Sequence, residues 1–171
     1  MKSDPRNARI ALMYAQYLAK SGDLTAAERE LKRLVEREPS HHEARFALAS
    51  VWLELGRLEQ ARAGFQSLSG DPRWQAQADF SLGLIDARQG KPENALRQFD
   101  RVGAGPLEFD ARFNGISALI SLGRLSEARE RLAAARQGFP GEALRLYLIE
   151  SELLVKNKEF IAAFDTLTEA L

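Results

Sequence analysis

Residues 8–41 read ARIALMYAQYLAKSGDLTAAERELKRLVEREPSH, and the fold can be predicted from this stretch. On either side of Gly22, apolar residues lie three and four positions apart, which is the spacing of one face of an α-helix. A glycine between them can adopt the left-handed backbone that ends a helix, and Pro39 stops the second apolar stretch. The stretch therefore predicts two helices joined by a tight turn.

The same pattern returns along the rest of the chain. The turn glycines are Gly22, Gly56, Gly90 and Gly123, at spacings of 34, 34 and 33 residues. A column of alanines follows them at Ala27, Ala61, Ala95, Ala128 and Ala163, and a column of larger residues at Leu31, Phe65, Phe99, Leu132 and Leu167. Because one hairpin cannot bury its apolar face alone, repeated hairpins stack on their neighbours. The repeat therefore predicts an all-α solenoid of about five helical hairpins.

The whole chain, residues 1–171, is predicted to be a single solenoid fragment with repeats near 8–41, 42–75, 76–108, 109–143 and 144–171. The first helices of the units are expected at 6–21, 41–55, 73–89, 107–122 and 142–157. The second helices are expected at 24–37, 58–68, 92–102, 125–137 and 160–171. Asp4 is a candidate N-cap for the first helix. Since the helical pattern runs close to both ends and Leu167 and Ala170 do not form a polar cap, further repeats are expected in a longer protein.

Composition excludes several classes of function. The 171 residues include 24 basic and 24 acidic side chains, so the formal net charge is zero and nothing in it attracts a polyanion. Cysteine is absent from the sequence, which excludes disulfides, thiol nucleophiles and thiolate metal sites. The sequence also lacks an apolar run of the ~18 residues that a membrane-spanning helix needs. Membrane insertion of this chain is therefore not expected.

Candidate catalytic groups are few. His41 and His42 are the two histidines of the chain, and neighbouring residues on a helix point about 100° apart, so they do not converge on one metal ion. They are predicted to be solvated residues at a helix start. Carboxylates such as Glu28 and Glu30 alternate with basic residues at helical spacing, which is typical of a solvent-exposed, salt-bridged face. We therefore predict no catalytic residues, no metal site and no cofactor.

The units resemble the tetratricopeptide repeat (TPR) family over essentially the whole chain. The first unit has Tyr14-Ala15, Gly22-Asp23 and Ala27 at the positions where the family keeps its characteristic residues. Two departures are Lys158, which replaces the turn glycine of the fifth unit, and Gly115-Ile116, which reverses a small and a large residue. The resemblance implies a right-handed solenoid whose concave surface, formed by the first helices, holds a partner.

That resemblance also implies which residues would line the concave surface. The fifth position of each unit carries Leu12, Phe46, Phe80, Phe113 and Leu148, and the positions one and two turns further on include Leu84, Leu53 and Ile120. These side chains either pack between adjacent first helices or line an apolar groove that receives an amphipathic helix or an extended segment. The Lys and Asn with which some TPR units grip a C-terminal carboxylate are not found at these positions, so that mode of binding is not expected.

The leading functional hypothesis is a non-catalytic protein-interaction scaffold or adaptor that holds a polypeptide with an apolar segment. One alternative is a homo-oligomerisation module. A nucleic-acid-binding helical repeat is a second alternative, and the neutral charge and the missing basic stripe argue against it. Residues 147–154 resemble part of long bacterial TPR lipoproteins of the cell envelope, one group of which are adaptors for a carboxyl-terminal processing protease. This resemblance implies a periplasmic or outer-membrane-attached location rather than a cytoplasmic one.

Overall fold

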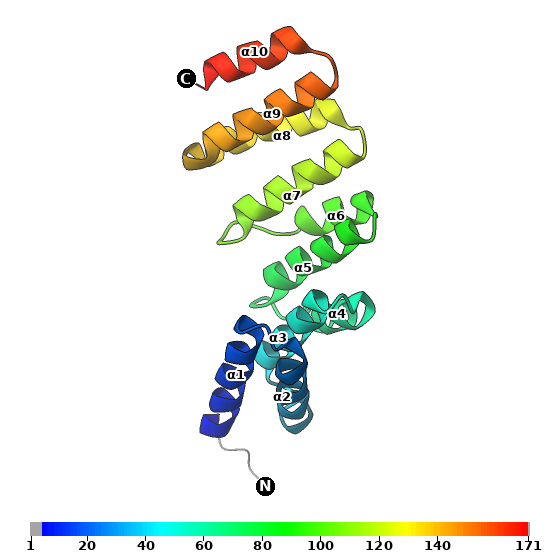
Figure 1. Cartoon of the computed structure of the whole chain (residues 1–171), viewed down its shortest axis with the longest axis vertical. Helices are drawn as coiled ribbons and strands as arrows, with labels where there is room; N and C mark the ends of the chain where they lie inside the picture. Colours follow the sequence, from blue (N-terminus) through cyan, green and yellow to red (C-terminus); the bar gives the residue numbers. More distant parts are fainter. Residues whose placement is uncertain (1–4, 171) are drawn as a thin grey trace. The chain divides into compact units, whose positions relative to one another are not determined.

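A computed structural model describes residues 5–170, and within them the chain forms ten α-helices and one short 3₁₀ helix (Figure 1). The α-helices are α1 (Pro5–Lys20), α2 (Leu24–Arg37), α3 (His42–Glu54), α4 (Leu58–Gln66), α5 (Gln75–Arg88), α6 (Pro92–Phe99), α7 (Glu108–Ser121), α8 (Leu125–Gly138), α9 (Ala143–Lys156) and α10 (Phe160–Glu169). The 3₁₀ helix η1 spans Pro140–Glu142. Every α-helix begins and ends within three residues of its predicted bounds, so the all-α prediction is confirmed. The proposed N-cap Asp4 lies outside the described residues.

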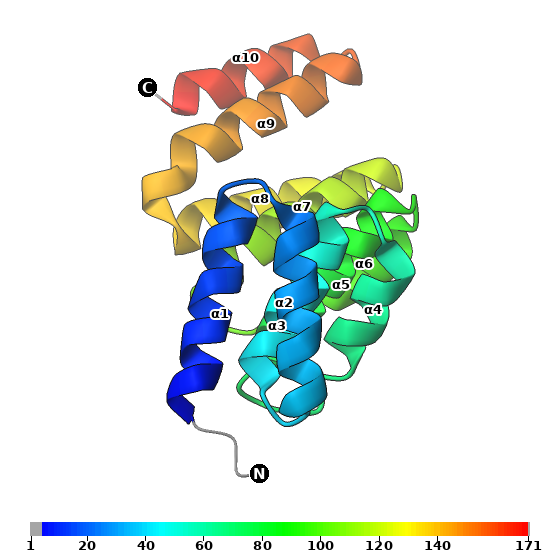
Figure 2. The ribbon, with the colours of Figure 1, turned by 60° about the horizontal axis from the view of Figure 1, so that its bottom comes forward.

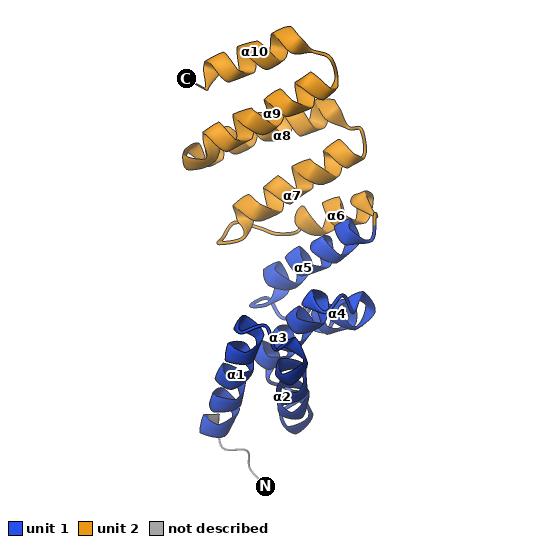
Figure 3. Ribbon diagram, in the orientation of Figure 1, with its two compact units in different colours: residues 1–89 blue, residues 90–171 orange. Residues whose placement is uncertain are grey.

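The chain divides into two compact units, residues 1–89 and residues 90–171 (Figure 3). Helices α1 to α5 belong to the first unit, and α6 to α10 belong to the second. Each unit has its own apolar core, as expected of a repeat protein in which each helix contacts its sequence neighbours. The arrangement of all five hairpins as one solenoid stays a prediction.

In the first unit, each helix packs against the next one along the chain, and α1, α2 and α3 lie side by side (Figure 2). The apolar face of α2 is buried between its neighbours: Leu31 and Leu34 share a core with Leu12 of α1 and with Leu48 and Val51 of α3. A second core surrounds α4, and its buried members are Ala49, Leu53, Ala61, Phe65, Leu68, Ala78, Leu82 and Ile85. The cores are therefore assembled from successive helices rather than from distant segments.

The second unit repeats this arrangement. Leu132 of α8 is fully buried in a core with Leu119 of α7 and Leu146 of α9, and α10 packs against α9. The alanine column supplies Ala128 to this core, with no exposed surface. Small buried residues at this position allow paired helices to approach closely.

The turn inside each hairpin has a left-handed backbone. Gly22 has a φ of +88°, and the other turn glycines, Gly56, Gly90 and Gly123, have φ between +67° and +72°. Lys158 has a φ of 65° at the corresponding position of the fifth hairpin. The fifth turn therefore keeps the conformation of the others although its residue differs, at the modest cost of placing an L side chain in this region.

We expect Gly64→Ala to destabilise the first unit. A Cβ atom on Gly64 of α4 would lie 2.7 Å from the Cβ of Ala49 on α3, so one helix must shift. Overpacking of this kind costs about 1–3 kcal/mol. The matched control is Gly115→Ala in α7, where the nearest atom is 3.6 Å away on the side chain of Leu96. Because a glycine inside a helix costs about 0.5–1 kcal/mol relative to alanine, the control should be neutral or stabilising. Urea unfolding of both variants checks the difference in sign.

Candidate functional site

A groove runs between α1 and α3 in the first unit. One part of it, of about 520 Å³, is lined by Arg9, Leu12, Met13, Gln16, His41 and Glu43. A second part, of about 370 Å³, is lined by Ala15, Gln16, Ala19, Lys20, Leu31, Phe46, Ala47, Ser50, Val51 and Glu54. Gln16 lines both parts, so the two hollows adjoin along the two helices. We call them together the α1–α3 groove.

Helical periodicity explains how two helices supply the walls of the groove. Among the lining residues of α1, Arg9, Met13, Gln16 and Lys20 follow one another at steps of three and four. Among those of α3, Glu43, Ala47, Ser50 and Glu54 follow the same steps. The two sets lie 34 residues apart in the sequence, so corresponding turns of the two helices supply corresponding residues.

The charges of the groove are arranged by wall. Its basic residues, Arg9 and Lys20, come from α1, and its acidic residues, Glu43 and Glu54, come from α3. Between these ends the lining is formed mainly by small apolar residues and by the ring of Phe46, together with Gln16 and Ser50. The groove therefore offers an apolar middle with a basic wall on one side and an acidic wall on the other.

Phe46 lines the α1–α3 groove and also packs inside the first unit. Its ring centroid lies 5.3 Å from that of Phe65, in an edge-to-face arrangement, and 5.4 Å from that of Trp74. The ring is half-buried as a result. The sequence offers two interpretations of this residue, packing between helices and lining of a groove. Each describes part of its surroundings.

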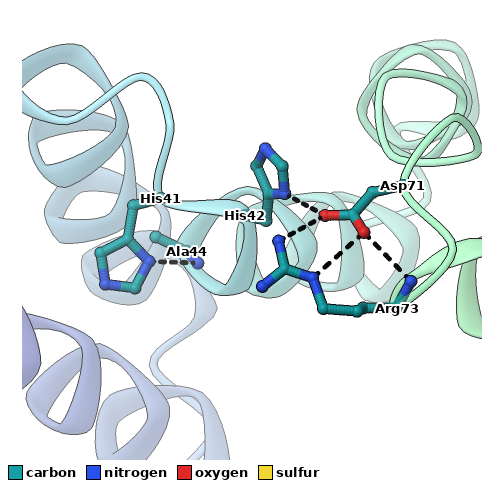
Figure 4. A network of polar contacts seen from close by, with 5 residues as sticks. All are labelled: His41, His42, Ala44, Asp71 and Arg73. Atoms are coloured by element: carbon teal, nitrogen blue, oxygen red, sulfur yellow. Dashed lines mark hydrogen bonds and ion pairs between the residues drawn. The ribbon is translucent and has the colours of Figure 1, made fainter.

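The two histidines lie at the start of α3, beside the groove (Figure 4). Nδ1 of His41 accepts a hydrogen bond from the backbone N–H of Ala44 at 3.3 Å and so caps the helix. Nδ1 of His42 donates to Oδ2 of Asp71 at 2.7 Å. The prediction of a helix start is right, but the prediction of solvated side chains is wrong, because both rings are partly buried and hydrogen-bonded.

Asp71 lies in the connection between α4 and α5 and accepts from two other groups besides His42 (Figure 4). The guanidinium of Arg73 binds both carboxylate oxygens, with Nη2 at 2.9 Å from Oδ2, and the backbone N–H of Arg73 donates to Oδ1 at 3.0 Å. These bonds, those of Arg73 first, hold the pKa of the Asp71 carboxyl well below its ordinary value. The network ties the start of α3 to the connection that leads into α5.

Acid should weaken this network in a defined direction. Because the pKa of Asp71 is lowered on folding, its ionised form contributes stability that is complete above the ordinary carboxyl pKa of about 4 and is lost as the pH falls toward the lower folded pKa. We therefore expect Asp71→Asn to lower stability at pH 7 and to reduce the loss of stability between about pH 4 and pH 2. Urea unfolding at both ends of this range measures the effect. If Arg73→Ala leaves the acid dependence unchanged, the assigned cause is wrong.

Three buried carboxylates fix the helices next to the groove and in the second unit. Glu28 of α2 accepts from the indole Nε1 of Trp52 at 3.0 Å and pairs with Lys32 and Arg57. The hydrogen bond from Lys32 is the main cause that lowers the pKa of the Glu28 carboxyl. The prediction that Glu28 lies on a solvent-exposed face is therefore wrong: it is buried where α2 meets α3. A comparable contact joins α4 to α5, where Asp86 pairs with Arg62. Another joins α8 to α9, where Glu150 pairs with Arg129 and Arg136.

A sequence signal for these contacts does exist. Glu28, Arg62 and Arg129 each follow directly after a residue of the alanine column. This position faces the first helix of the next hairpin. The polar partners on that helix are Trp52, Asp86 and Glu150, in the same order, and they lie 21 to 24 residues further along the chain. When a charged residue directly follows the recurring alanine, it is thus a candidate for an ion pair between hairpins rather than for a solvent-exposed side chain.

In the second unit, Arg145 covers Phe113, the aromatic residue that the predicted surface has there. The guanidinium of Arg145 lies 4.4 Å from the ring centroid of Phe113 and 5.9 Å from that of Phe109. Phe109 also contacts Phe139 edge to face at 5.2 Å. Phe113 is half-buried in this cluster. Cation–π contacts of this kind contribute about 0.5–1 kcal/mol at exposed sites.

The remaining residues of the predicted surface differ in their exposure. Leu12 and Leu53 are buried, Phe80, Leu84 and Ile120 are half-buried, and Leu148 is exposed. Leu12 lines one part of the α1–α3 groove and Phe46 lines the other. Leu53 instead belongs to the core around α4.

Neither a metal site nor a membrane-spanning helix is present in the described part of the chain. Over residues 5–170, His, Asp and Glu side chains form no cluster of three or more that is suited to a metal ion. Among the same residues, every helix is too short or too polar to cross a bilayer.

The family model described as "Tetratricopeptide repeat" matches residues 12–72 and 80–143, which is most of the chain. Among curated relatives, the TPR repeat-containing protein PA4667 of Pseudomonas aeruginosa is 35% identical over 94 residues. That match covers 55% of this chain and 16% of PA4667. The chain spans less than a fifth of the length of the curated relatives that it matches.

Solved structures share the fold. MamA from Desulfovibrio magneticus RS-1 superimposes with a TM-score of 0.80 at 18% identity, covering 95% of this chain and 92% of that one. YrrB, described as a TPR protein with an unusual peptide-binding site, has a TM-score of 0.68 at 20% identity and covers 94% of this chain and 82% of its own. At these identities the likeness extends to the fold.

Proposed function

We propose that this chain, which belongs to the tetratricopeptide repeat family, is a non-catalytic scaffold that holds a segment of a polypeptide partner in the α1–α3 groove. TPR repeats are typically non-catalytic and imply protein or peptide partners. The observation that carries the proposal is the shape and charge of this groove: an apolar middle between a basic and an acidic wall. The peptide-binding site of YrrB supports the choice of a peptide as partner.

The lining of the groove indicates the chemistry of the bound segment. The small side chains Ala15, Ala19 and Ala47 leave room beside Phe46 for an apolar side chain of the partner. Gln16, between the charged ends, places an amide within reach of a peptide backbone. The Ser50 hydroxyl donates to the backbone oxygen of Phe46 and keeps its capacity to accept a hydrogen bond. Charges of opposite sign on the two walls would orient the segment rather than simply attract it. The proposed ligand is therefore a segment with an apolar residue flanked by acidic and basic residues.

In each unit, further residues of the predicted surface are proposed to add contacts to a partner. These are Phe80 and Leu84 in the first unit and Phe113, Ile120 and Leu148 in the second, whereas Leu53 lies in the core around α4. Because Phe46 and Phe113 also pack inside their units, truncating them would change folding and binding together. A test of the site therefore needs residues that line the groove without supporting the core.

Binding is tested by selecting peptides from a displayed random library on the wild-type chain and measuring the affinity of the selected peptides by calorimetry. Ser50→Arg would fill the groove and is expected to lower the affinity of these peptides at least tenfold, about the effect of losing one central contact. The control is Ser126→Arg, an exposed serine in the first turn of α8. Equal affinities for both variants, or a library that yields no specific peptide, would contradict the proposal.

As its cellular setting, we propose a role in bacterial envelope protein assembly or proteolysis, on the resemblance of residues 147–154 to envelope TPR lipoproteins. Cell fractionation with an antibody against the chain checks this setting. Detection in the cytoplasmic fraction alone would contradict it and would leave the groove proposal intact.

A further inference from the structure

The outer face of α1 is apolar and exposed. Ile10, Met13, Tyr14 and Tyr17 lie on it at helical spacing, and each is between 54% and 67% exposed. We call these four residues the α1 stripe. It lies on the opposite side of α1 from Ala8 and Ala15, which are buried in the core of the first unit. An apolar stripe of this size on a helix indicates a surface that another helix covers.

A second exposed stripe lies on α10. It consists of Phe160, Ile161, Phe164 and Leu167, with Phe164 71% and Ile161 81% exposed. We call these four residues the α10 stripe. Ala163 and Thr166 on the other side of the helix are buried. Both α1 and α10 thus use one face inside their unit and leave the other face open.

The repeat shows what the α1 stripe is built to contact. Shifting Ile10, Tyr14 and Tyr17 by 34 residues gives Ala44, Leu48 and Val51 of α3. These three residues of α3 are buried in the core that contains Leu31 and Leu34 of α2. In the first unit, this face of a first helix therefore packs against the second helix of the preceding hairpin.

The α10 stripe corresponds in the same way to the partner face. Phe164 and Leu167 follow Ala163 by one and four residues, as Arg129 and Leu132 follow Ala128 on α8. On α8 these residues face α9: Arg129 binds Glu150, and Leu132 shares a core with Leu146. The face of α10 that corresponds to this one is therefore shaped to receive a first helix.

We propose that α10 of one copy of this chain packs against α1 of a second copy, repeating between chains the contact that α2 makes with α3 and α8 makes with α9. Consecutive helices joined by short loops pack antiparallel, and the contact between chains would have the same direction. It is a heterologous contact, in which two different faces meet. Met13 belongs to both surfaces, whereas Tyr14 and Phe164 lie outside the lining of the α1–α3 groove.

The register of the repeat selects this pairing over the symmetric ones. The α1 stripe corresponds to the face that α3 packs against α2, and Phe164 and Leu167 of the α10 stripe correspond to residues of α8 that contact α9. At the position of Phe164, an apolar ring replaces the charged Glu28, Arg62 or Arg129 that pairs with a polar group inside the units.

Two single-residue variants test the proposal with the 171-residue chain. Tyr14→Glu would place a carboxylate in the α1 stripe, and Phe164→Glu would place one in the α10 stripe. Both side chains are mostly exposed, so the units should stay folded, which circular dichroism verifies. Ser126→Glu on α8 is the control for added charge, because it lies outside both stripes. Each protein is followed by sedimentation velocity from about 1 to about 200 µM, the range expected for a small interface.

The wild-type chain and the Ser126→Glu control should associate as concentration rises. Each stripe variant alone should associate at least about tenfold more weakly, because a buried carboxylate would lack a partner. Mixed in equal amounts, the two variants should form a heterodimer and stop there, since each retains one intact stripe.

Other outcomes would overturn the proposal. A symmetric α1 contact would leave Phe164→Glu associating by itself, and a symmetric α10 contact would leave Tyr14→Glu associating by itself. Association of both variants at wild-type strength would place the contact outside the stripes. A wild-type chain that stays monomeric throughout the range would leave both stripes to a different partner.

Discussion

Phe65→Ala is expected to lower the free energy of unfolding by about 3–5 kcal/mol, the range measured for truncating a buried phenylalanine. The ring has no exposed surface and lies in the core that joins α3, α4 and α5. Its edge-to-face contact with Phe46 adds to the loss, because such pairs contribute about 0.5–1.5 kcal/mol beyond their buried area.

The position of Phe65 in the repeat decides where the loss is felt. Phe65 stands where the other units have Leu31, Phe99, Leu132 and Leu167. In a repeat protein each helix is stabilised mainly by its neighbours, so a cavity here weakens α4 and its contacts before it weakens α10. Amide hydrogen exchange should therefore rise first over residues 42–88 and little over residues 125–170.

The control for this prediction is Phe65→Leu, which keeps an apolar side chain and should cost roughly 1–2 kcal/mol. Urea unfolding gives the loss of unfolding free energy for each variant, and amide hydrogen exchange shows which helices are destabilised. A loss below about 1 kcal/mol for the alanine variant would show that α3 and α5 collapse onto the cavity, contrary to the close packing that the buried core implies.

The helices can be predicted from the sequence because their signals are local and repeated five times. Apolar spacing, turn glycines such as Gly22 and the alanine column each act within one hairpin, and their agreement fixes the bounds of the helices to within three residues. Even Lys158 does not disturb the pattern, because the helices on both sides determine the conformation of the turn between them.

The candidate site is predicted less completely because it depends on pairs of residues that are distant in the sequence. His42 is hydrogen-bonded because the connection after α4 brings Asp71 to it, 29 residues away. Phe46 is half-buried because the same connection supplies Trp74. Neither the hydrogen bond nor the ring contact corresponds to a repeated pattern in the sequence. The resemblance to the family places Leu12 and Phe46 on one surface, but not the opposite charges of the two groove walls.

Arg136→Ala is expected to destabilise the second unit by about 3 kcal/mol, near the lower end of the cost of breaking a buried ion pair. Nη1 of Arg136 on α8 lies 2.5 Å from Oε2 of Glu150 on α9, and the side chain of Glu150 is 7% exposed. Removing the arginine leaves that carboxylate with Arg129, whose Nε is 3.2 Å from Oε1. The variant also loses the stacking of the guanidinium on Tyr147, at 4.2 Å from the ring centroid.

A double-mutant cycle separates the charge from the packing. If the cost of Arg136→Ala comes from the carboxylate left without its main partner, adding Glu150→Gln should recover about half of it, because a neutral amide is cheaper to bury. Arg129→Ala is the matched control: this arginine is more exposed, and its loss should cost about 1 kcal/mol. If Glu150→Gln recovers nothing in the Arg136→Ala background, the stacking on Tyr147, rather than the ion pair, holds α8 against α9.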